Sequence, residues 1–300
     1  MVVTGLHILQ TYQCNFECNH CFVYSCPNAK GVMKISDIRK ILKEAKTTGN
    51  IKWIYFEGGE PFLYYQTMLW GISKAIEHGF KVGIVTNAYW ATSVEDAKEW
   101  LTPISKLGIS DLSLSDDIYH YSKEDENLAI HAFEAAKKLN IPVNMITIEE
   151  PIDHSQEIEW KGKPIMKGKV LFKGRAVDKL ASNLTGKPWT EFDKCLDEDF
   201  CDQTRIHIDP FGYVHVCQGI TIGNINHSSL KEILDNFKPE EHPICGPIIR
   251  GGPAQLAKDY NIELEQEFID ECHLCYLVRL KLRNTFPNIL KPDQVYGIIS

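Results

Sequence analysis

Three cysteines stand close together near the start of the chain, in the segment QCNFECNHCF at positions 13–22. Cys14, Cys18 and Cys21 have the spacing C-x3-C-x2-C, and their common partner could be one another, a zinc ion, or iron and sulfide. Structural zinc takes four Cys or His ligands in a tetrahedron. His20 could be the fourth ligand, but it lies between Cys18 and Cys21, where four side chains converge poorly. The spacing therefore favours three thiolates on a [4Fe-4S] cluster, with one iron open to another ligand.

A second group of cysteines lies from residue 195 onward. The chain has ten cysteines, and in a cytoplasmic protein we do not expect disulfides, because the cytosol keeps thiols reduced. Metal sites at both ends explain the cysteines economically, and structural zinc stays open as the alternative for the C-terminal one. Candidate ligands there are Cys195, Cys201, Cys217, Cys272 and Cys275. Cys26 and Cys245 are expected to be free thiols.

The composition of the 300-residue chain narrows the class of protein. Hydrophobic residues make up 44% and charged residues 24%, which are values of a globular chain. The net charge of -8 argues against a nucleic-acid or anionic-membrane surface. The start, MVVTGLHILQ, lacks the basic region of a signal peptide, and no apolar run is long enough to span a membrane. We therefore expect a soluble, cytoplasmic protein that binds neither nucleic acid nor membranes.

A second motif follows the cysteine array. The segment IKWIYFEGGEP at positions 51–61 predicts a strand that ends in Gly58, Gly59, Glu60 and Pro61. The cysteine array and this motif together resemble the radical S-adenosylmethionine (radical SAM) enzymes. Their signature is C-x3-C-x2-C after the first strand and G-G-E-P after the second. The paired match is far more specific than either motif alone.

The resemblance implies where the cofactors bind. In the family the three cysteines hold three irons, and the amino and carboxylate groups of SAM chelate the fourth. The G-G-E segment bonds the SAM amino group, because glycines allow a close backbone approach. Other polar and aromatic residues of the family, at strand ends and beside the third cysteine, contact the rest of SAM. The SAM-site residues implied in this way are Gly58, Gly59, Glu60, Asn87, Ser113, His20 and Phe22.

The elements that must position these residues follow from the hydrophobic pattern. Strands are predicted at 6–12, 52–57, 81–88, 111–117, 142–150 and 168–174, with an irregular crossover at 151–164 before the last. Helices are predicted at 36–49, 64–78 and 123–140, and a further one is capped by Thr92 with Glu95. Alternating strands and helices predict an α/β fold with right-handed parallel units. With the resemblance, the expected form is a partial (β/α)6 TIM-like barrel over residues 1–184, with its chemistry at the C-terminal strand ends.

The segment DLSLSDD places side chains by its period of two. Ser113 and Ser115 share one face of the strand and Leu112 and Leu114 the other, so we expect the serines to point into the barrel. Asp116, Asp117 and His120 follow this strand and are interpreted as a solvated loop. Arg175 is interpreted as a surface arginine. No residue is assigned as the catalytic acid or base.

The C-terminal part, residues 185–300, is expected to form a second, small domain. TRIHIDPFGYVHVCQG predicts a β-hairpin whose turn is at 209–212, and a serine-capped helix follows. The cysteine spacing here resembles the SPASM and twitch extensions of radical SAM enzymes. A full SPASM domain has more cysteines after its C-x2-C, whereas this chain has none after Cys275. The resemblance therefore implies one auxiliary [4Fe-4S] cluster, on Cys201, Cys217, Cys272 and Cys275, with Cys195 as a competitor.

These parts predict an enzyme of the radical SAM class. The resemblance implies reductive cleavage of SAM to a 5'-deoxyadenosyl radical that takes hydrogen from a substrate C–H. A low-potential electron donor such as flavodoxin or ferredoxin is the expected partner. We expect the substrate to be a small molecule that is oxidised with the help of the auxiliary cluster. The alternatives are a maturase that modifies a ribosomal peptide or a protein side chain and, more remotely, a non-enzymatic zinc or electron-transfer protein.

Overall fold

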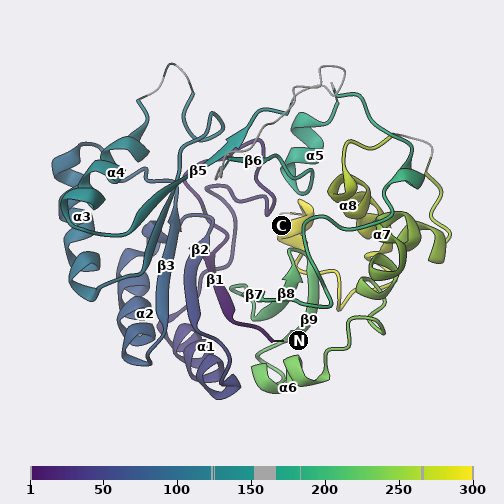
Figure 1. The fold of residues 1–300 in the computed structure, drawn as a ribbon, viewed down its shortest axis with the longest axis horizontal. Coiled ribbons are helices and arrows are strands. Elements are labelled where there is room, and N and C mark those ends of the chain that lie inside the picture. The colour runs from purple at the N-terminus through teal and green to yellow at the C-terminus, as the bar shows by residue number, and fades with distance from the viewer. Residues whose placement is uncertain are drawn as a thin grey trace.

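The sheet at the centre of the molecule has nine strands, in the order β6-β5-β4-β3-β2-β1-β7-β8-β9 (Figure 1). The structure is a computed structural model, and it describes residues 2–122, 124, 126–151, 167–182, 184–264 and 267–298. The six N-terminal strands pair in parallel, as the alternation of strands and helices predicted. They are β1 (Gly5–Thr11), β2 (Trp53–Gly58), β3 (Lys81–Thr86), β4 (Asp111–Ser115), β5 (Val143–Glu149) and β6 (Lys167–Lys169).

Helices cover the outer face of this curved sheet. They are α1 (Ile35–Thr48), α2 (Tyr65–Glu77), α3 (Val94–Leu107) and α4 (Leu128–Lys138), and Figure 1 shows all four on the same side. The buried face of α1 carries Ile38, Ile41, Leu42 and Ala45 at helical spacing. Strand residues such as Phe56 point toward this layer and are fully buried. The apolar core therefore lies between sheet and helices, and the inner face of the strands is free to carry polar groups.

The barrel differs from its sequence-based description in two details. The N-cap of α3 is Ser93, whose side chain accepts from the Asp96 amide, so the predicted Thr92–Glu95 box is wrong by one residue. Both hydroxyl residues are good caps, and the structure uses the later one. Strand β6 is shorter than the predicted 168–174, because Gly174 turns the chain into α5 (Arg175–Leu180). The predicted crossover at 151–164 lies outside the described residues, apart from Pro151.

The C-terminal hairpin extends the barrel sheet. Strand β7 (Arg205–Ile208) pairs in parallel with the free edge of β1, and β8 (Tyr213–Cys217) and β9 (Ile220–Asn224) follow antiparallel. The hairpin prediction is confirmed, but β9 was not expected. Ser229 caps α6 (Leu230–Asn236) through a capping box with Glu232, as predicted. The last helices are α7 (Cys245–Asp259) and α8 (Glu271–Leu282), on the right in Figure 1.

Three short 3-10 turns complete the described structure, at Pro61–Tyr64, Trp189–Glu191 and Asp293–Tyr296. Among the described residues, every helix is too short or too polar to span a bilayer.

Candidate functional site

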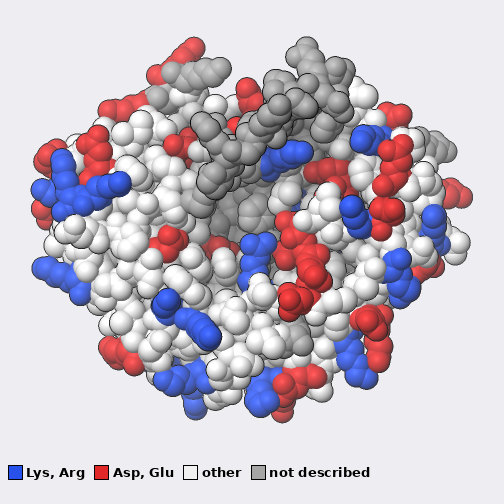
Figure 2. Space-filling model, viewed as in Figure 1, with Lys and Arg blue, Asp and Glu red and all other residues white. Residues whose placement is uncertain are grey.

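A cavity of about 560 Å³ lies inside the partial barrel. Figure 2 shows that the molecule is hollowed at the centre of this view, with acidic and basic side chains around the hollow. The strands β1 to β4 bring their C-terminal ends to the cavity, which is where a parallel barrel places its chemistry. Its lining contains all but one of the residues expected to hold the first cluster and SAM, namely Cys14, Cys18, Cys21, His20, Phe22, Gly58, Gly59, Asn87 and Ser113.

The loop after β1 presents the first three cysteines to this cavity. Amide N–H groups point at their sulfurs: Phe16 donates to Cys14 Sγ at 3.4 Å and Ser25 donates to Cys21 Sγ at 3.3 Å. The Asn87 side-chain amide is 3.5 Å from Cys14 Sγ. Hydrogen bonds of this kind stabilise charged sulfur and set the potential of iron–sulfur clusters.

The cysteine sulfurs are not arranged as the ligands of a tetrahedral zinc ion. Within the described parts of the chain, no three cysteine sulfurs lie within 4.8 Å of one another. Zinc bonds to sulfur are about 2.3 Å long, so tetrahedral zinc would need sulfurs about 3.8 Å apart. Burial, and then the Glu60 carboxylate, raise the pKa of the Cys14 thiol to about 12. The Cys14 thiol therefore needs a strongly bound metal centre to be a thiolate at neutral pH.

Gly58 and Gly59 are required by the close contact between β2 and the cluster loop. A Cβ atom on Gly58 would lie 2.3 Å from the Thr11 carbonyl oxygen, and one on Gly59 would lie 2.1 Å from that of Gln13. Gly58 also has a φ of 143°, which other residues rarely adopt. The Gly59 amide donates to Thr11 O at 2.6 Å. The glycines therefore fix the end of β2 against the backbone that leads to Cys14.

Glu60 is fully buried and does not line the cavity. Its carboxylate accepts hydrogen bonds from the Phe62 amide (2.9 Å), the Thr86 hydroxyl (2.8 Å) and the Asn87 amide (2.8 Å). Burial raises the pKa of Glu60 to about 7, although these three hydrogen bonds oppose the shift. Glu60 thus joins the ends of β2 and β3 and orients Asn87, whose side chain reaches the cluster loop at Asn15.

The loop after β4 was predicted to be solvated, but the structure shows that its side chains make buried contacts with one another and with the cluster loop. Asp117 is 2% exposed, and its carboxylate bonds His120 Nδ1 at 2.8 Å. His20 from the cluster loop lies 3.9 Å from the same carboxylate and packs on the Tyr119 ring. Burial lowers the pKa of His20 to about 4, so its imidazole is neutral. Asp116 accepts from the Thr147 hydroxyl at 2.5 Å. The prediction of a solvated loop is wrong because tertiary contacts with His20 and His120 bury the Asp117 carboxylate.

Arg175 was expected at the surface and is instead buried beneath the cluster loop. Its guanidinium donates to the carbonyl oxygens of Cys18 (2.9 Å) and Ser25 (2.8 Å). The Arg175 amide donates to Cys21 O at 2.9 Å. The start of α5 therefore holds the loop from behind. Phe22 is 40% exposed, at the rim of the cavity.

Ser113 lies on the cavity side of β4, whereas Leu112 and Leu114 are fully buried toward the helices. Its hydroxyl donates to Asp111 Oδ2 at 2.8 Å and accepts from Asn144 Nδ2 at 3.0 Å. Ser115 also lines the cavity. The period of two thus gives the observed orientation of this strand.

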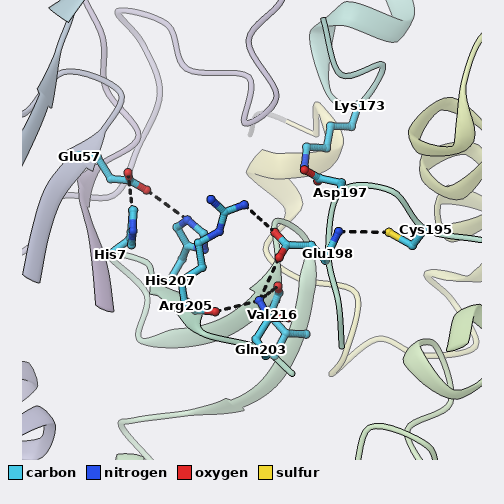
Figure 3. Close-up of polar contacts among 10 residues, drawn as sticks. All are labelled: His7, Glu57, Lys173, Cys195, Asp197, Glu198, Gln203, Arg205, His207 and Val216. Atoms are coloured by element: carbon cyan, nitrogen blue, oxygen red, sulfur yellow. Dashed lines mark hydrogen bonds and ion pairs between the residues drawn. The ribbon is translucent and has the colours of Figure 1, made fainter. Parts of the chain in front are cut away.

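Four cysteines gather in the C-terminal part, from three separate elements. Burial raises the pKa of the Cys195 thiol to about 12. A hydrogen bond from the Glu198 amide opposes this shift, and the neighbouring Cys275 and Cys217 add to it. That amide donates to Cys195 Sγ at 3.4 Å (Figure 3). Burial raises the pKa of Cys272, with Cys217 among the smaller causes. Cys217 ends β8, and Cys272 and Cys275 lie in the first turns of α8, three residues apart on one face.

Two other cysteines, Cys201 and Cys245, differ in burial and in their interaction with these four thiols. Cys201, which the sequence analysis put in the ligand set, is exposed and is not among the main groups acting on the other thiols. Cys245 is fully buried, and burial, followed by Cys217 and Cys275, raises the pKa of its thiol. The structure therefore brings together four of the five candidate ligands and adds a thiol that was expected to be free.

Two buried cations face the C-terminal cysteines, and the sequence analysis missed both. Lys173 pairs with Asp197 at 2.7 Å (Figure 3), and the thiols of Cys217 and Cys272 act strongly on its ammonium. Arg279 is 1% exposed and donates to Gln218 O at 2.9 Å. No sequence motif marks either residue, because their partners lie far away along the chain. Their charges would compensate bound thiolates.

Comparison with known proteins supports this geometry. The family model of the Radical SAM superfamily matches residues 8–155, and that of the SPASM iron–sulfur cluster-binding domain matches 195–276. A Bacillus subtilis protein described as "putative peptide biosynthesis protein YydG" is 24% identical over 288 residues, which are 94% of this chain and 82% of that protein. The tungsten-containing aldehyde ferredoxin oxidoreductase cofactor-modifying protein of Pyrococcus furiosus is 31% identical over 38% of this chain and 30% of its own.

A solved structure resembles the fold. The crystal structure of BtrN in complex with AdoMet and 2-DOIA has a TM-score of 0.53 at 16% identity and covers 79% of this chain and 83% of that one. The likeness confirms the predicted α/β barrel fold. The two family models confirm the predicted cofactors, SAM and [4Fe-4S] clusters.

Proposed function

We propose a reaction and a substrate class for this chain, which belongs to the radical SAM superfamily. When bound, the first cluster and SAM supply an electron and a 5'-deoxyadenosyl radical that takes hydrogen from a substrate C–H. The observation that carries the proposal is the meeting of Cys14, Cys18 and Cys21 with Gly58-Gly59 at one cavity. A low-potential donor of the flavodoxin or ferredoxin type would deliver the electron.

The side chains of the cavity would bind and orient the cofactors. The three cysteines would hold the first cluster, with amide N–H groups supporting their sulfurs. Gly58 and Gly59 line the cavity with backbone that carries no side chain. The amino group of SAM could therefore approach this backbone beside the open coordination position of the first cluster. Glu60 would act as a positioning residue, because its carboxylate is fully used in joining β2 to β3. Ser113 and Phe22 lie where a ribose and an adenine could be contacted.

For the auxiliary cluster we propose Cys195, Cys217, Cys272 and Cys275 as ligands. The support is their mutual proximity, the N–H group aimed at Cys195 Sγ, and the start of the SPASM match at residue 195. The N-terminus of α8 also favours negative charge beside Cys272. Cys201 gives way to Cys195 in this set because it is exposed, and Cys245 would stay a buried neighbour.

As substrate we propose a peptide, modified at a C–H bond. The support is the match to a protein described as a peptide biosynthesis protein, which extends over 94% of this chain. The likeness to BtrN concerns the fold alone, so it does not favour the small-molecule substrate that the sequence analysis placed first.

The proposal is tested with anaerobically reconstituted protein and SAM, reduced by flavodoxin. We expect 5'-deoxyadenosine and methionine, measured by chromatography and mass spectrometry. Peptides translated from short reading frames beside the gene are then added in D2O. We expect one of them to gain deuterium or lose two hydrogens while it speeds 5'-deoxyadenosine formation. Turnover of sugars or aminocyclitols with no change in any peptide would overturn the substrate class, and absence of 5'-deoxyadenosine would overturn the reaction.

A further inference from the structure

Three side chains on the inner face of the sheet form a compact group outside the cluster and SAM residues. They are His7 on β1, Glu57 on β2 and His207 on β7. His7 Nδ1 lies 2.9 Å from Glu57 Oε2, and His207 Nε2 lies 3.4 Å from Glu57 Oε1 (Figure 3). His7 and Glu57 line the cavity. Strand pairing holds the group rigidly, because His7 is in register with both Tyr55 and His207.

His207 is a buried histidine whose imidazole has an unsatisfied ring nitrogen. It is 8% exposed; its Nδ1 has no hydrogen-bond partner in the part of the chain that the structure describes, and its Nε2 lies 3.4 Å from Glu57 Oε1. Figure 3 shows its ring directed at Glu57 from across the sheet. A buried polar group without a partner is costly, and a bound ligand would remove the cost.

The Glu57 carboxylate lies between the two rings, and each of its oxygens faces one imidazole nitrogen. The Arg205 guanidinium has its own counter-ion, Glu198, at 3.2 Å (Figure 3). Among the described residues, the ion-pair contacts of Glu57 are therefore with the two imidazoles and not with an arginine or lysine.

The distances suit a metal ion. Each residue offers one donor atom within 4.8 Å of the other two, and the two imidazoles lie 2.9 and 3.4 Å from different oxygens of the carboxylate. Ligands bound at about 2.1 Å lie about 3.0–3.4 Å apart around a first-row ion. Two histidines and one carboxylate with open positions bind Fe²⁺, Mn²⁺, Co²⁺ or Zn²⁺ in other proteins. The Tyr55 ring stacks on His7 at 4.7 Å and fixes its orientation.

We propose that His7, Glu57 and His207 bind one divalent first-row transition-metal ion whose open positions face the barrel cavity. An oxygen ligand of the substrate would complete its coordination. On the proposed function, which this last step rests on, that ligand is a peptide carbonyl or carboxylate oxygen. The ion would fix the substrate as a Lewis acid, separately from the iron–sulfur centres.

Binding of Mn²⁺ tests the site without any need for turnover. Reconstituted holoenzyme is treated with EDTA, gel-filtered and titrated anaerobically with Mn²⁺, and free Mn²⁺ is counted from its room-temperature EPR signal. We expect one Mn²⁺ per chain in addition to the cluster iron. Glu57→Gln and His207→Gln should each weaken binding more than about tenfold. Glu77→Gln, at the exposed end of α2, is the control for the charge change, and it should bind Mn²⁺ normally.

The outcomes separate this site from its alternatives. Unchanged Mn²⁺ binding in Glu57→Gln, or no binding in the wild-type enzyme, overturns the proposal. Loss of binding in Asp117→Asn with retention in Glu57→Gln would overturn it in favour of the His20–Asp117–His120 group. Iron content and SAM cleavage without added Mn²⁺ are measured in every variant. Failure of those two readouts would count against folding or against the proposed function, not against the ion site.

Discussion

The two cysteine sites of this molecule are built in opposite ways. The first takes all three cysteines from one loop of eight residues, Cys14–Cys21, between β1 and α1. The second collects Cys195 from a loop, Cys217 from the end of β8, and Cys272 and Cys275 from the start of α8. A local site can be predicted from the spacing of its cysteines alone, whereas a site assembled across about 80 residues depends on how the elements pack.

The two sites also differ in the charges around them. Glu60 acts on Cys14 and Asp117 acts on Cys18, so acidic groups border the first site, with Arg175 opposing them. The second site also has acidic neighbours, Asp197, Glu198 and Asp270. Two buried cations, Lys173 and Arg279, oppose them and act more strongly on the Cys217 thiol. Positive charge stabilises the reduced form of a cluster. The C-terminal cluster should therefore have the higher reduction potential, as suits an electron acceptor.

The largest expected effect comes from removing the local site. The triple variant Cys14→Ala, Cys18→Ala, Cys21→Ala should lose 5'-deoxyadenosine formation entirely, because no cluster remains to reduce SAM. Iron, measured by colorimetric assay after reconstitution, should fall from about eight to about four per chain, the content of one remaining [4Fe-4S] cluster. Cys26→Ala, next to the motif, should keep both iron and activity. Wild-type 5'-deoxyadenosine formation in the triple variant would contradict the assignment.

The dispersed site gives the next largest effect and the sharpest pairwise test. Cys195→Ser should cost about four irons and destabilise the C-terminal part, since metal binding there is also folding free energy. Cys201→Ser should keep about eight irons, because its side chain is exposed. Iron analysis and thermal unfolding of both variants decide between them. The reverse pattern would restore the ligand set expected from the sequence.

The sequence could predict those features that depend on neighbouring residues. The first cluster site, the six parallel strands and the orientation of Ser113 all follow from local motifs or from a period of two. The inner faces of β1 and β2 follow the same rule, so alternation could have placed His7 and Glu57 in the barrel. The sequence analysis did not apply it there, because the strands were interpreted only by their ends.

Other features needed the packed chain. Asp117 lies in a loop and Arg175 begins α5, and only tertiary contacts reveal that these polar residues are buried. The pairing of β7 with β1 brings His207 beside His7, although 200 residues separate them. Lys173 and Asp197 also come together only in the packed chain. Composition favours exposure for each of these residues, and the structure overrides it with specific partners.

A moderate effect should follow from changing the charge at the second site. Lys173→Met removes a buried cation beside Cys217 and Cys272, so the potential of the C-terminal cluster should fall by on the order of tens of millivolts. Potentiometric titration followed by EPR measures it. Lys173→Arg keeps the charge and should shift the potential little. The double variant Lys173→Met, Asp197→Asn removes both members of the pair and guards against misfolding from an unpaired Asp197. An unchanged or raised potential in Lys173→Met would contradict the prediction that buried cations raise the reduction potential of the C-terminal cluster.

The smallest expected effect concerns the SAM side of the cavity. The Ser113 hydroxyl already donates to Asp111 and accepts from Asn144, so it can give SAM at most one further hydrogen bond. Ser113→Ala should therefore weaken SAM binding by about 0.5–1.5 kcal/mol, measured as the Kd by equilibrium dialysis. Iron content should not change, because the hydroxyl does not contact the cluster loop. Ser110→Ala, just before the start of the same strand, is the matched control and should leave the Kd as it is. A loss above a hundredfold, or loss of iron, would mean that Ser113 supports the local site itself, and the first site would then depend on distant residues as the second one does.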